Sequence, residues 1–311
     1  MRIAVFGAGG VGGYFGGRLA QAGEEVIFIA RGAHLQAMRA TGLWVESIKG
    51  DFRVQPVWAC DDPAEVGTVD AVIVAVKAWQ VTEAAQAMKP LMGSQTFVVP
   101  LENGVEAPEQ LAAILGRERV LGGLCRIATF IVEPGHIRHT GIEPYIAFGE
   151  LDGSASERAE RLRAVFANAG VWAEIPADIR TALWEKFVFI AAISGGGAVT
   201  RAPAGVLRSI PETRQMLIQA IEEAANVARA HRISLPQEVV QKVMGFIDRL
   251  PEGTLASMQR DIGEGRPSEL EAQNGAVVRL GRAVGVPTPT HAFLYASLLP
   301  QEKRARGEKG F

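Results

Sequence analysis

The chain has 311 residues, of which 48% are hydrophobic and 21% are charged, as in an ordinary soluble globular protein. This length is more than one hydrophobic core comfortably fills, so we expect two domains. The 32 basic and 34 acidic residues give a net charge of -2, which excludes a general attraction of the whole protein to nucleic acid or an anionic membrane.

The first thirty residues have the order of a strand, a helix and a second strand. A short apolar run at residues 2–6 ends in glycines, a small-residue helix is predicted over 11–22, and a second apolar run covers 26–30. Strands and helices are expected to keep alternating over 69–76, 80–88, 96–99 and 106–115. This alternation predicts an α/β fold of the Rossmann type, with a doubly wound parallel sheet.

Strand-like runs become shorter after Leu121 and turn residues separate them, which predicts antiparallel additions. An amphipathic helix over 155–169 and a strand over 171–175 are then expected to close a first domain at residues 1–176. The remainder, residues 177–311, is predicted to be an all-helical domain. Its clearest helices are expected at 182–193, 211–231, 236–250 and 268–284. The basic tail is expected to be a solvated, frayed terminus.

The motif GAGGVG, between the first strand and the first helix, predicts a dinucleotide site. Gly7 allows the tight turn, Gly9 lets the backbone approach a pyrophosphate, and Gly12 lets the helix pack close to the strand. The helix start at Gly10 and Val11 offers backbone N–H groups to phosphates. The alternative is a glycine-rich turn without a ligand. The nearby Gly13, Gly16 and Gly17 are expected to serve helix packing.

The second strand ends at Arg31, where an NAD site would have an acidic residue. A guanidinium at this position can pair with the 2′-phosphate of NADPH, so NADPH is the expected cofactor. The alternative is a solvated surface arginine.

Further polar residues stand where ligands are expected. Lys77 and Asn103 follow strand runs, where Lys77 would hold a phosphate or a substrate carboxylate and Asn103 would bind the nicotinamide or the substrate. The alternative for each is an ordinary loop residue. Lys186 begins the apolar segment KFVFIAAI, and its ammonium would stabilise and protonate the alkoxide formed by hydride attack on a ketone. Equally, it is a snorkelling lysine at the end of a buried helix.

The segment SMQRDIGEGRPSELE adds Ser257, Asp261 and Glu269. A carboxylate here would orient Lys186, and a serine would bind a substrate carboxylate. The alternative is helix capping, in which Ser268 and Glu271 form a capping box and Glu269 is an acidic first-turn residue.

These motifs together resemble the ketopantoate reductase (2-dehydropantoate 2-reductase) family. The resemblance runs from GAGGVG through KAWQ at 77–80, ENG at 102–104, LWEK at 183–186, SMQRD at 257–261 and GRPSELEAQNG at 265–275. It implies a Rossmann domain joined to a helical domain, with Lys186 as general acid and Glu269 as partner of the substrate or the lysine. It also implies a substrate contact at Ser257 and cofactor-side roles for Arg31, Lys77 and Asn103.

The chain departs from the family in one helix. The family commonly has asparagines four and eight residues after the lysine, whereas this chain has Ile190 and Ser194, followed by Gly195, Gly196 and Gly197. Ser194 stays a candidate substrate contact, and the exact substrate is left open. The glycines indicate either a close approach of a substrate or of the other domain to the backbone, or a flexible helix end.

The remaining composition predicts no metal and a cytoplasmic protein. Cys60 and Cys125 are too few for a disulfide framework, and the closest histidines, His136 and His139, fall in a strand or hairpin.

The leading hypothesis is NADPH-dependent reduction of 2-dehydropantoate to pantoate, towards pantothenate and coenzyme A. The alternatives are a reductase of another 2-oxo acid and a non-catalytic NADPH-sensing regulatory protein. A small-molecule 2-oxo acid is the expected partner, with assembly as a homodimer.

Overall fold

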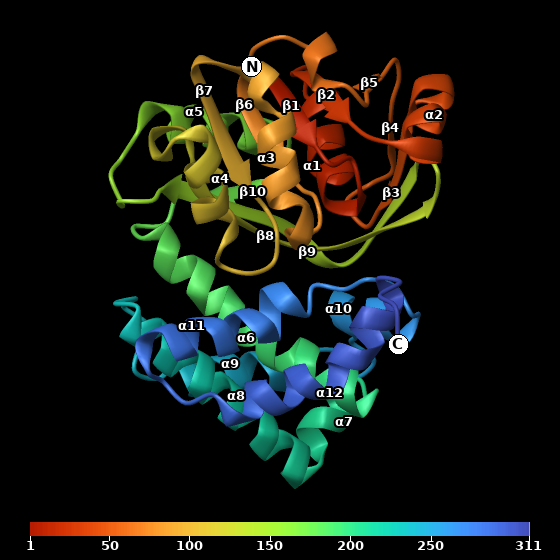
Figure 1. Cartoon of the computed structure of the whole chain (residues 1–311). Coiled ribbons are helices and arrows are strands. Elements are labelled where there is room, and N and C mark those ends of the chain that lie inside the picture. Colours follow the sequence, from red (N-terminus) through yellow and green to blue (C-terminus); the bar gives the residue numbers. More distant parts are fainter. Residues whose placement is uncertain (311) are drawn as a thin grey trace. The chain divides into compact units, whose positions relative to one another are not determined.

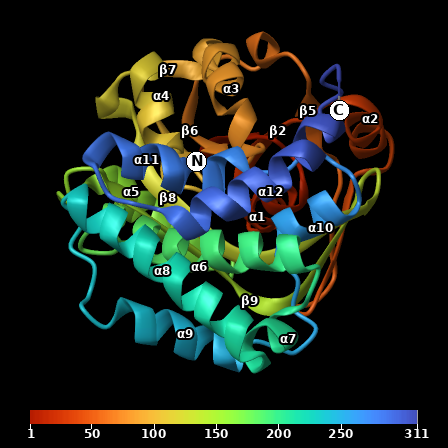
Figure 2. The same cartoon turned by 60° about the horizontal axis from the view of Figure 1, so that its bottom comes forward.

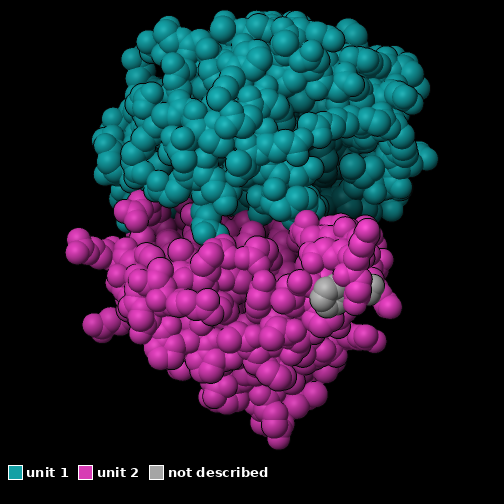
Figure 3. All heavy atoms as spheres, viewed as in Figure 1, with its two compact units in different colours: residues 1–102, 106–179 teal, residues 103–105, 180–311 magenta. Residues whose placement is uncertain are grey.

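A computed structural model describes residues 1–310 and divides them into two compact units. Unit 1 consists of residues 1–102 and 106–179, and unit 2 of residues 103–105 and 180 onwards, as coloured in Figure 3. The short segment 103–105 therefore belongs to unit 2, although it lies between two elements of unit 1 in the sequence.

Unit 1 contains a five-stranded parallel sheet in the order β5-β2-β1-β6-β7 (Figure 1). Its strands are β1 (Arg2–Phe6), β2 (Glu25–Ile29), β5 (Trp58–Cys60), β6 (Val69–Val74) and β7 (Met92–Pro100). The order reverses between β1 and β6, and ligands of doubly wound sheets bind at the carboxyl ends of strands at such a switch point. The Rossmann-type prediction is confirmed.

A second five-stranded sheet completes unit 1. It contains β3 (Leu43–Ser47), β4 (Phe52–Val54), β8 (Leu121–Glu133), β9 (His136–Glu150) and β10 (Trp172–Glu174). The predicted short runs after Leu121 are in fact two long strands, β8 and β9, which pair as an antiparallel hairpin. The predicted strand over 171–175 is β10, which pairs parallel to β9.

The helices of unit 1 are α1 (Gly10–Gln21), α2 (Gly32–Thr41), α3 (Val81–Ala87), α4 (Ala107–Leu115) and α5 (Glu157–Asn168). Short 3₁₀ turns lie at Pro63–Glu65, Ala78–Gln80, Lys89–Leu91 and Arg117–Arg119.

Helix α1 packs against strands of both sheets, which explains its small residues. A Cβ on Gly16 would lie 2.6 Å from the Phe28 ring of β2, and one on Gly13 would lie 2.2 Å from Ile137 Cδ1 of β9. Larger side chains would force the layers apart. The predicted packing role of these glycines is confirmed.

Unit 2 is helical, as predicted (Figure 2). Its helices are α6 (Ile179–Thr200, of which the first residue belongs to unit 1), α7 (Ala204–Ser209), α8 (Pro211–Ala230), α9 (Val239–Arg249), α10 (Ser257–Gly263), α11 (Ala276–Val284) and α12 (Pro289–Ala305). A π-helical turn, Glu271–Gly275, precedes α11, so the helix expected over 268–284 is not a regular α-helix. Its core joins α6, α7, α8, α9 and α11.

The basic tail is not frayed over its first part. Helix α12 continues to Ala305, its buried Glu302 binds Ser268, and Arg306 donates to the Ser268 carbonyl at 3.0 Å. These contacts hold the end of α12 against the segment that contains Ser268, because the Glu302 carboxylate accepts hydrogen bonds from the Ser268 N–H and Oγ.

Within residues 1–310, α6 is the one helix that is long and apolar enough to cross a membrane, but 67% of its apolar window is buried. This burial is typical of a core helix.

Candidate functional sites

The glycine turn lies at the switch point of the parallel sheet. Gly7 has a φ of +99°, and a Cβ there would lie 2.7 Å from the Ala75 carbonyl oxygen at the end of β6. A Cβ on Gly12 would lie 2.1 Å from the Gly7 carbonyl oxygen, whereas one on Gly9 would meet no atom within 4 Å. The three glycines therefore form a tight turn and a close helix contact, with open space over Gly9.

The amino end of α1 is suited to an anion. Gly9 is the N-cap residue and provides no side-chain acceptor, and the first turn contains no acidic residue. The backbone N–H groups at the start of a helix have no intrahelical partner, and the helix dipole favours negative charge there. Gly10 and Val11 begin this turn, so the residues present fit a dinucleotide pyrophosphate.

Arg31 is exposed at the N-cap position of α2, directly after the second strand. Its Nη1 and Nη2 groups both donate to Glu83 Oε1 of α3, each at 3.3 Å. Both side chains are more than 60% exposed, so the pair is weak and a stronger anion can replace the carboxylate. The sequence analysis did not consider Glu83, because the two residues are 52 positions apart.

Lys77 follows β6 and is exposed, with its Nζ 5.9 Å from the centre of the Trp79 ring. A carboxylate that the sequence analysis passed over lies nearby in the same unit. Glu102, two residues after β7, is buried, and its Oε1 accepts a hydrogen bond of 3.1 Å from the Val76 backbone N–H. This bond ties the carboxyl ends of β6 and β7 together.

Asn103 lies in unit 2, where its Nδ2 donates to Glu269 Oε2 at 2.9 Å. The same carboxylate oxygen lies 3.4 Å from Nε2 of Gln273. Glu269 is only 5% exposed, so its carboxylate is a buried acceptor held by two side-chain amides. Glu269 is thus more than an acidic first-turn residue.

The expected capping box does not form. Ser268 Oγ donates to Glu302 and accepts from the Leu270 N–H at 3.2 Å, while Glu271 accepts from Arg279 and Tyr295. The competing partners are residues of α11 and α12, which local sequence spacing does not reveal.

Lys186 is half-buried on α6, four and eight residues before Ile190 and Ser194, so the three share one helical stripe. The neighbouring Glu185 is paired with Lys242 of α9 at 3.1 Å. Ser194 is fully buried, and no other residue within 1–310 forms a hydrogen bond with its Oγ.

The glycine run in α6 lets polar side chains approach the backbone. A Cβ on Gly195 would lie 2.4 Å from Nδ2 of Asn274, and one on Gly197 would lie 2.5 Å from Oε1 of Gln259. The helix continues to Thr200, so the flexible helix end is wrong. The side chains that approach these glycines belong to the same unit, and an approach by a substrate or by the other domain stays a prediction.

Ser257 is the first residue of α10 and is half-buried. Asp261, in the same helix, accepts from Arg266 Nη2 at 2.8 Å and from its Nε at 3.1 Å. Asp261 therefore has a structural partner close in sequence.

The histidines pair with other groups. His139 bonds Ser47 Oγ and the Ile142 carbonyl, each at 2.8 Å. Among residues 1–310, no group of three or more His, Cys, Asp and Glu side chains has the arrangement of a metal site.

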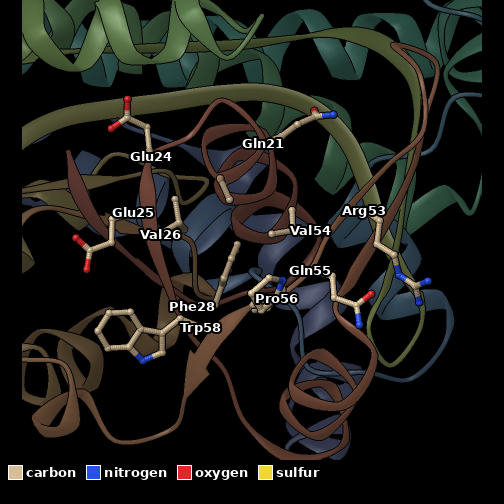
Figure 4. A pocket seen from close by; sticks show the side chains of 12 residues that line it. Gln21, Glu24, Glu25, Val26, Phe28, Arg53, Val54, Gln55, Pro56 and Trp58 are labelled. Carbon is tan, nitrogen blue, oxygen red and sulfur yellow. The ribbon is translucent and has the colours of Figure 1, made fainter.

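One pocket of unit 1 is lined by other residues (Figure 4). It is beside the beginning of β2, the opposite end of that strand from Arg31, and its lining includes Phe28, Trp58 and Arg53. None of the candidate residues lines it.

Known proteins of one family match both units. The family described as "Ketopantoate reductase PanE/ApbA" matches residues 3–153, and its C-terminal domain matches residues 178–302. The 2-dehydropantoate 2-reductase of Mesorhizobium japonicum (strain LMG 29417 / CECT 9101 / MAFF 303099) is 33% identical, over 93% of this chain and 94% of that protein.

Two solved structures extend the comparison. A PanE/ApbA family ketopantoate reductase from Ralstonia eutropha JMP134 has a TM-score of 0.90 at 35% identity, covering 98% of this chain and 100% of that chain. A D-mandelate dehydrogenase, solved with NADH and anilino(oxo)acetate, has a TM-score of 0.88 at 25% identity, covering 98% and 99%.

The Rossmann unit with its glycine turn and the helical unit with its buried carboxylate define an oxidoreductase, as these relatives are. The chain belongs to the ketopantoate reductase family. The resemblance expected from the sequence is confirmed.

Proposed function

We propose that the protein reduces 2-dehydropantoate to pantoate with NADPH, as a cytoplasmic homodimer. The observation that carries the proposal is the buried Glu269 carboxylate, held by Asn103 in a unit that matches the family's C-terminal domain. In this proposal residues 1–176 form the NADP-binding domain and residues 177–311 the substrate and catalytic domain.

The residues of unit 1 bind the cofactor in this proposal. The Gly9 face and the N–H groups of Gly10 and Val11 hold the pyrophosphate, and Gly7 and Gly12 shape the turn. Lys77 adds a cation to the same site, on the carboxyl side of β6. When bound, the nicotinamide would supply a hydride to the substrate carbonyl carbon.

Lys186 supplies the proton. Addition of a hydride to the ketone leaves its oxygen as an alkoxide, which is far too basic to persist at neutral pH. The Lys186 ammonium stabilises that charge and transfers one proton to the oxygen, which gives the alcohol and leaves a neutral amine that solvent reprotonates. Glu269 holds the substrate or orients the lysine, Asn103 fixes Glu269, and Ser257 and Ser194 are substrate contacts.

Arg31 selects NADPH in this proposal. Its guanidinium would exchange the weak contact with Glu83 for two charge-assisted hydrogen bonds to the 2′-phosphate. The cofactor named with D-mandelate dehydrogenase is NADH, which makes the nucleotide preference the first property to measure.

A second candidate is a reductase of another 2-oxo acid. Ile190 replaces an amide that the family commonly has, and a protein with the same fold is a D-mandelate dehydrogenase. The apolar Ile190 would favour a more apolar substrate side chain.

The test is the rate of NADPH oxidation with a panel of 2-oxo acids, including 2-dehydropantoate and phenylglyoxylate. We expect kcat/KM for 2-dehydropantoate to exceed the others by at least about tenfold, the effect of roughly 1.4 kcal/mol of selective transition-state binding. A preference for phenylglyoxylate would support the second candidate. No oxidation with any 2-oxo acid would overturn both.

A further inference from the structure

Gln273 is a buried amide in the π-helical turn of unit 2. It is fully buried, its backbone N–H donates to the Glu269 carbonyl at 3.0 Å, and its side-chain Nε2 lies 3.4 Å from Glu269 Oε2. Gln273 therefore follows Glu269 by about one turn and contacts the carboxylate directly.

The orientation of the Gln273 amide is fixed by this contact. If the amide were turned over, its oxygen would face the carboxylate oxygen of Glu269, and two acceptors would oppose each other. With Nε2 towards Glu269, Oε1 is buried and has no hydrogen-bond partner among residues 1–310. Burying an unpaired amide oxygen is costly, so a buried acceptor of this kind is suited to a hydrogen-bond donor from water or a ligand.

Neighbouring contacts hold this turn in place. Asn274 Nδ2 donates to the Ala191 carbonyl at 3.1 Å and lies 3.0 Å from Nδ1 of His291. Nε2 of His291 lies 2.9 Å from the Ala220 carbonyl and must donate to it, so Nδ1 accepts from Asn274. A π turn of this kind frequently occurs at functional sites because it displaces side chains from the regular helical positions.

We propose that Gln273 determines specificity by accepting a hydrogen bond, through Oε1, from a hydroxyl group on the side chain of the 2-oxo acid. The inference rests on the proposed function and narrows its substrate class to hydroxylated 2-oxo acids. Glu269 and Gln273 then present two adjacent acceptors to one end of the substrate.

The experiment compares two substrates that differ by a single hydroxyl group, 2-dehydropantoate and 3,3-dimethyl-2-oxobutanoate. The wild-type protein should have a kcat/KM for the hydroxylated substrate that is higher by about tenfold or more. One hydrogen bond next to a charged group contributes a preference of about this size. The Gln273→Leu variant should lose most of this preference, through a lower kcat/KM for 2-dehydropantoate alone.

Gln259 provides a matched control. It is also a nearly buried amide of unit 2, 8% exposed, and its Nε2 donates to the Ala202 carbonyl at 3.0 Å. The Gln259→Leu variant should keep the wild-type preference between the two substrates, even where its stability falls.

Thermal unfolding adds a second readout. Gln273→Leu removes an unpaired buried oxygen but also the Nε2 contact with the buried Glu269 carboxylate, so its unfolding temperature should fall no further than that of Gln259→Leu, which loses a hydrogen-bonded amide.

Three results would overturn the inference. An equal loss of kcat/KM with both substrates would mean that Gln273 only supports Glu269. A wild-type protein that reduces both substrates equally well would contradict the inference while leaving 2-oxo acid reduction intact. A wild-type protein that reduces no 2-oxo acid would overturn the proposed function itself.

Discussion

The glycine turn of unit 1 and the polar cluster of unit 2, which consists of Asn103, Glu269 and Gln273, are built from different parts of the polypeptide. In unit 1 the glycine turn and the helix start offer backbone N–H groups, and their positions depend on the absence of side chains at Gly7, Gly9 and Gly12. In unit 2 the groups are side chains, and Glu269 is positioned by residues distant in sequence. Substitutions should therefore affect binding in the first unit and chemistry or specificity in the second.

The largest effect is expected for Lys186→Ala, which should separate chemistry from cofactor binding. We predict that kcat falls about a hundredfold or more, as for loss of a general acid or an oxyanion stabiliser, with NADPH affinity nearly unchanged. Steady-state rates at saturating NADPH and a fluorescence titration measure the two quantities. A kcat within about threefold of wild type would contradict the role of Lys186.

The second largest effect is expected on the preference for NADPH over NADH, through the charge of Arg31, which follows β2. Arg31→Ala should weaken NADPH binding about ten- to a hundredfold and leave NADH binding almost unchanged, because only NADPH has a 2′-phosphate. Glu83→Gln should act in the opposite direction, since it removes a competing carboxylate. Titration of each variant with both nucleotides measures this, and equal losses for the two would exclude a phosphate contact.

Two glycine variants of unit 1 compare Gly9, which faces open space, with Gly12, which lies in close packing. Gly9→Ala adds a methyl group where no atom lies within 4 Å, so we expect an unchanged unfolding temperature and about tenfold weaker NADPH binding. Gly12→Ala places its methyl group 2.1 Å from the Gly7 carbonyl oxygen, so it should lower the unfolding temperature as well. A Gly9→Ala protein with wild-type affinity would show that no ligand approaches that face.

The smallest effect is the acid sensitivity of unit 2. Burial lowers the pKa of His291 below its ordinary value of 6.5, so the unfolded chain takes up a proton at pH values where the folded chain does not. Its stabilising contribution is therefore present above pH 6.5 and is lost as the pH falls below that value.

His291→Gln removes this titration and keeps an acceptor for Asn274. The loss of unfolding temperature on acidification should be smaller in the variant than in the wild-type protein. Burial lowers the pKa of His34 and His139 in unit 1 as well, so part of the acid sensitivity should remain. An unchanged pH dependence in His291→Gln would exclude this residue as a source.

The sequence predicted the Rossmann unit and its glycine turn because both depend on local patterns. Strand, turn and helix follow one another within thirty residues, and each glycine responds to a backbone requirement within that segment. The helical character of unit 2 was also predictable, because apolar residues recur at helical spacing over long segments of its sequence. The strands β3 and β4 were missed, because their short runs gain stability only by pairing in the second sheet.

The polar cluster of unit 2 was only partly predictable. Glu269 and Asn103 were found individually, but their contact spans 166 residues and no spacing rule connects them. Gln273 lacked any signal, because a glutamine within an apparently regular helix is ordinary. The π turn gives it its position, and that turn depends on partners in α6 and α12.

The assignment of residues 103–105 to unit 2 has a consequence for building hybrid proteins within the family. A chimera joined once, at the boundary near residue 179, would combine the Asn103 segment of one parent with the Glu269 of the other. A matched exchange must transplant two pieces of sequence, the tripeptide and the helical part, because one hydrogen bond of the helical half is encoded more than seventy residues before the junction. The residues that form this cluster are therefore encoded in two separate stretches of the sequence.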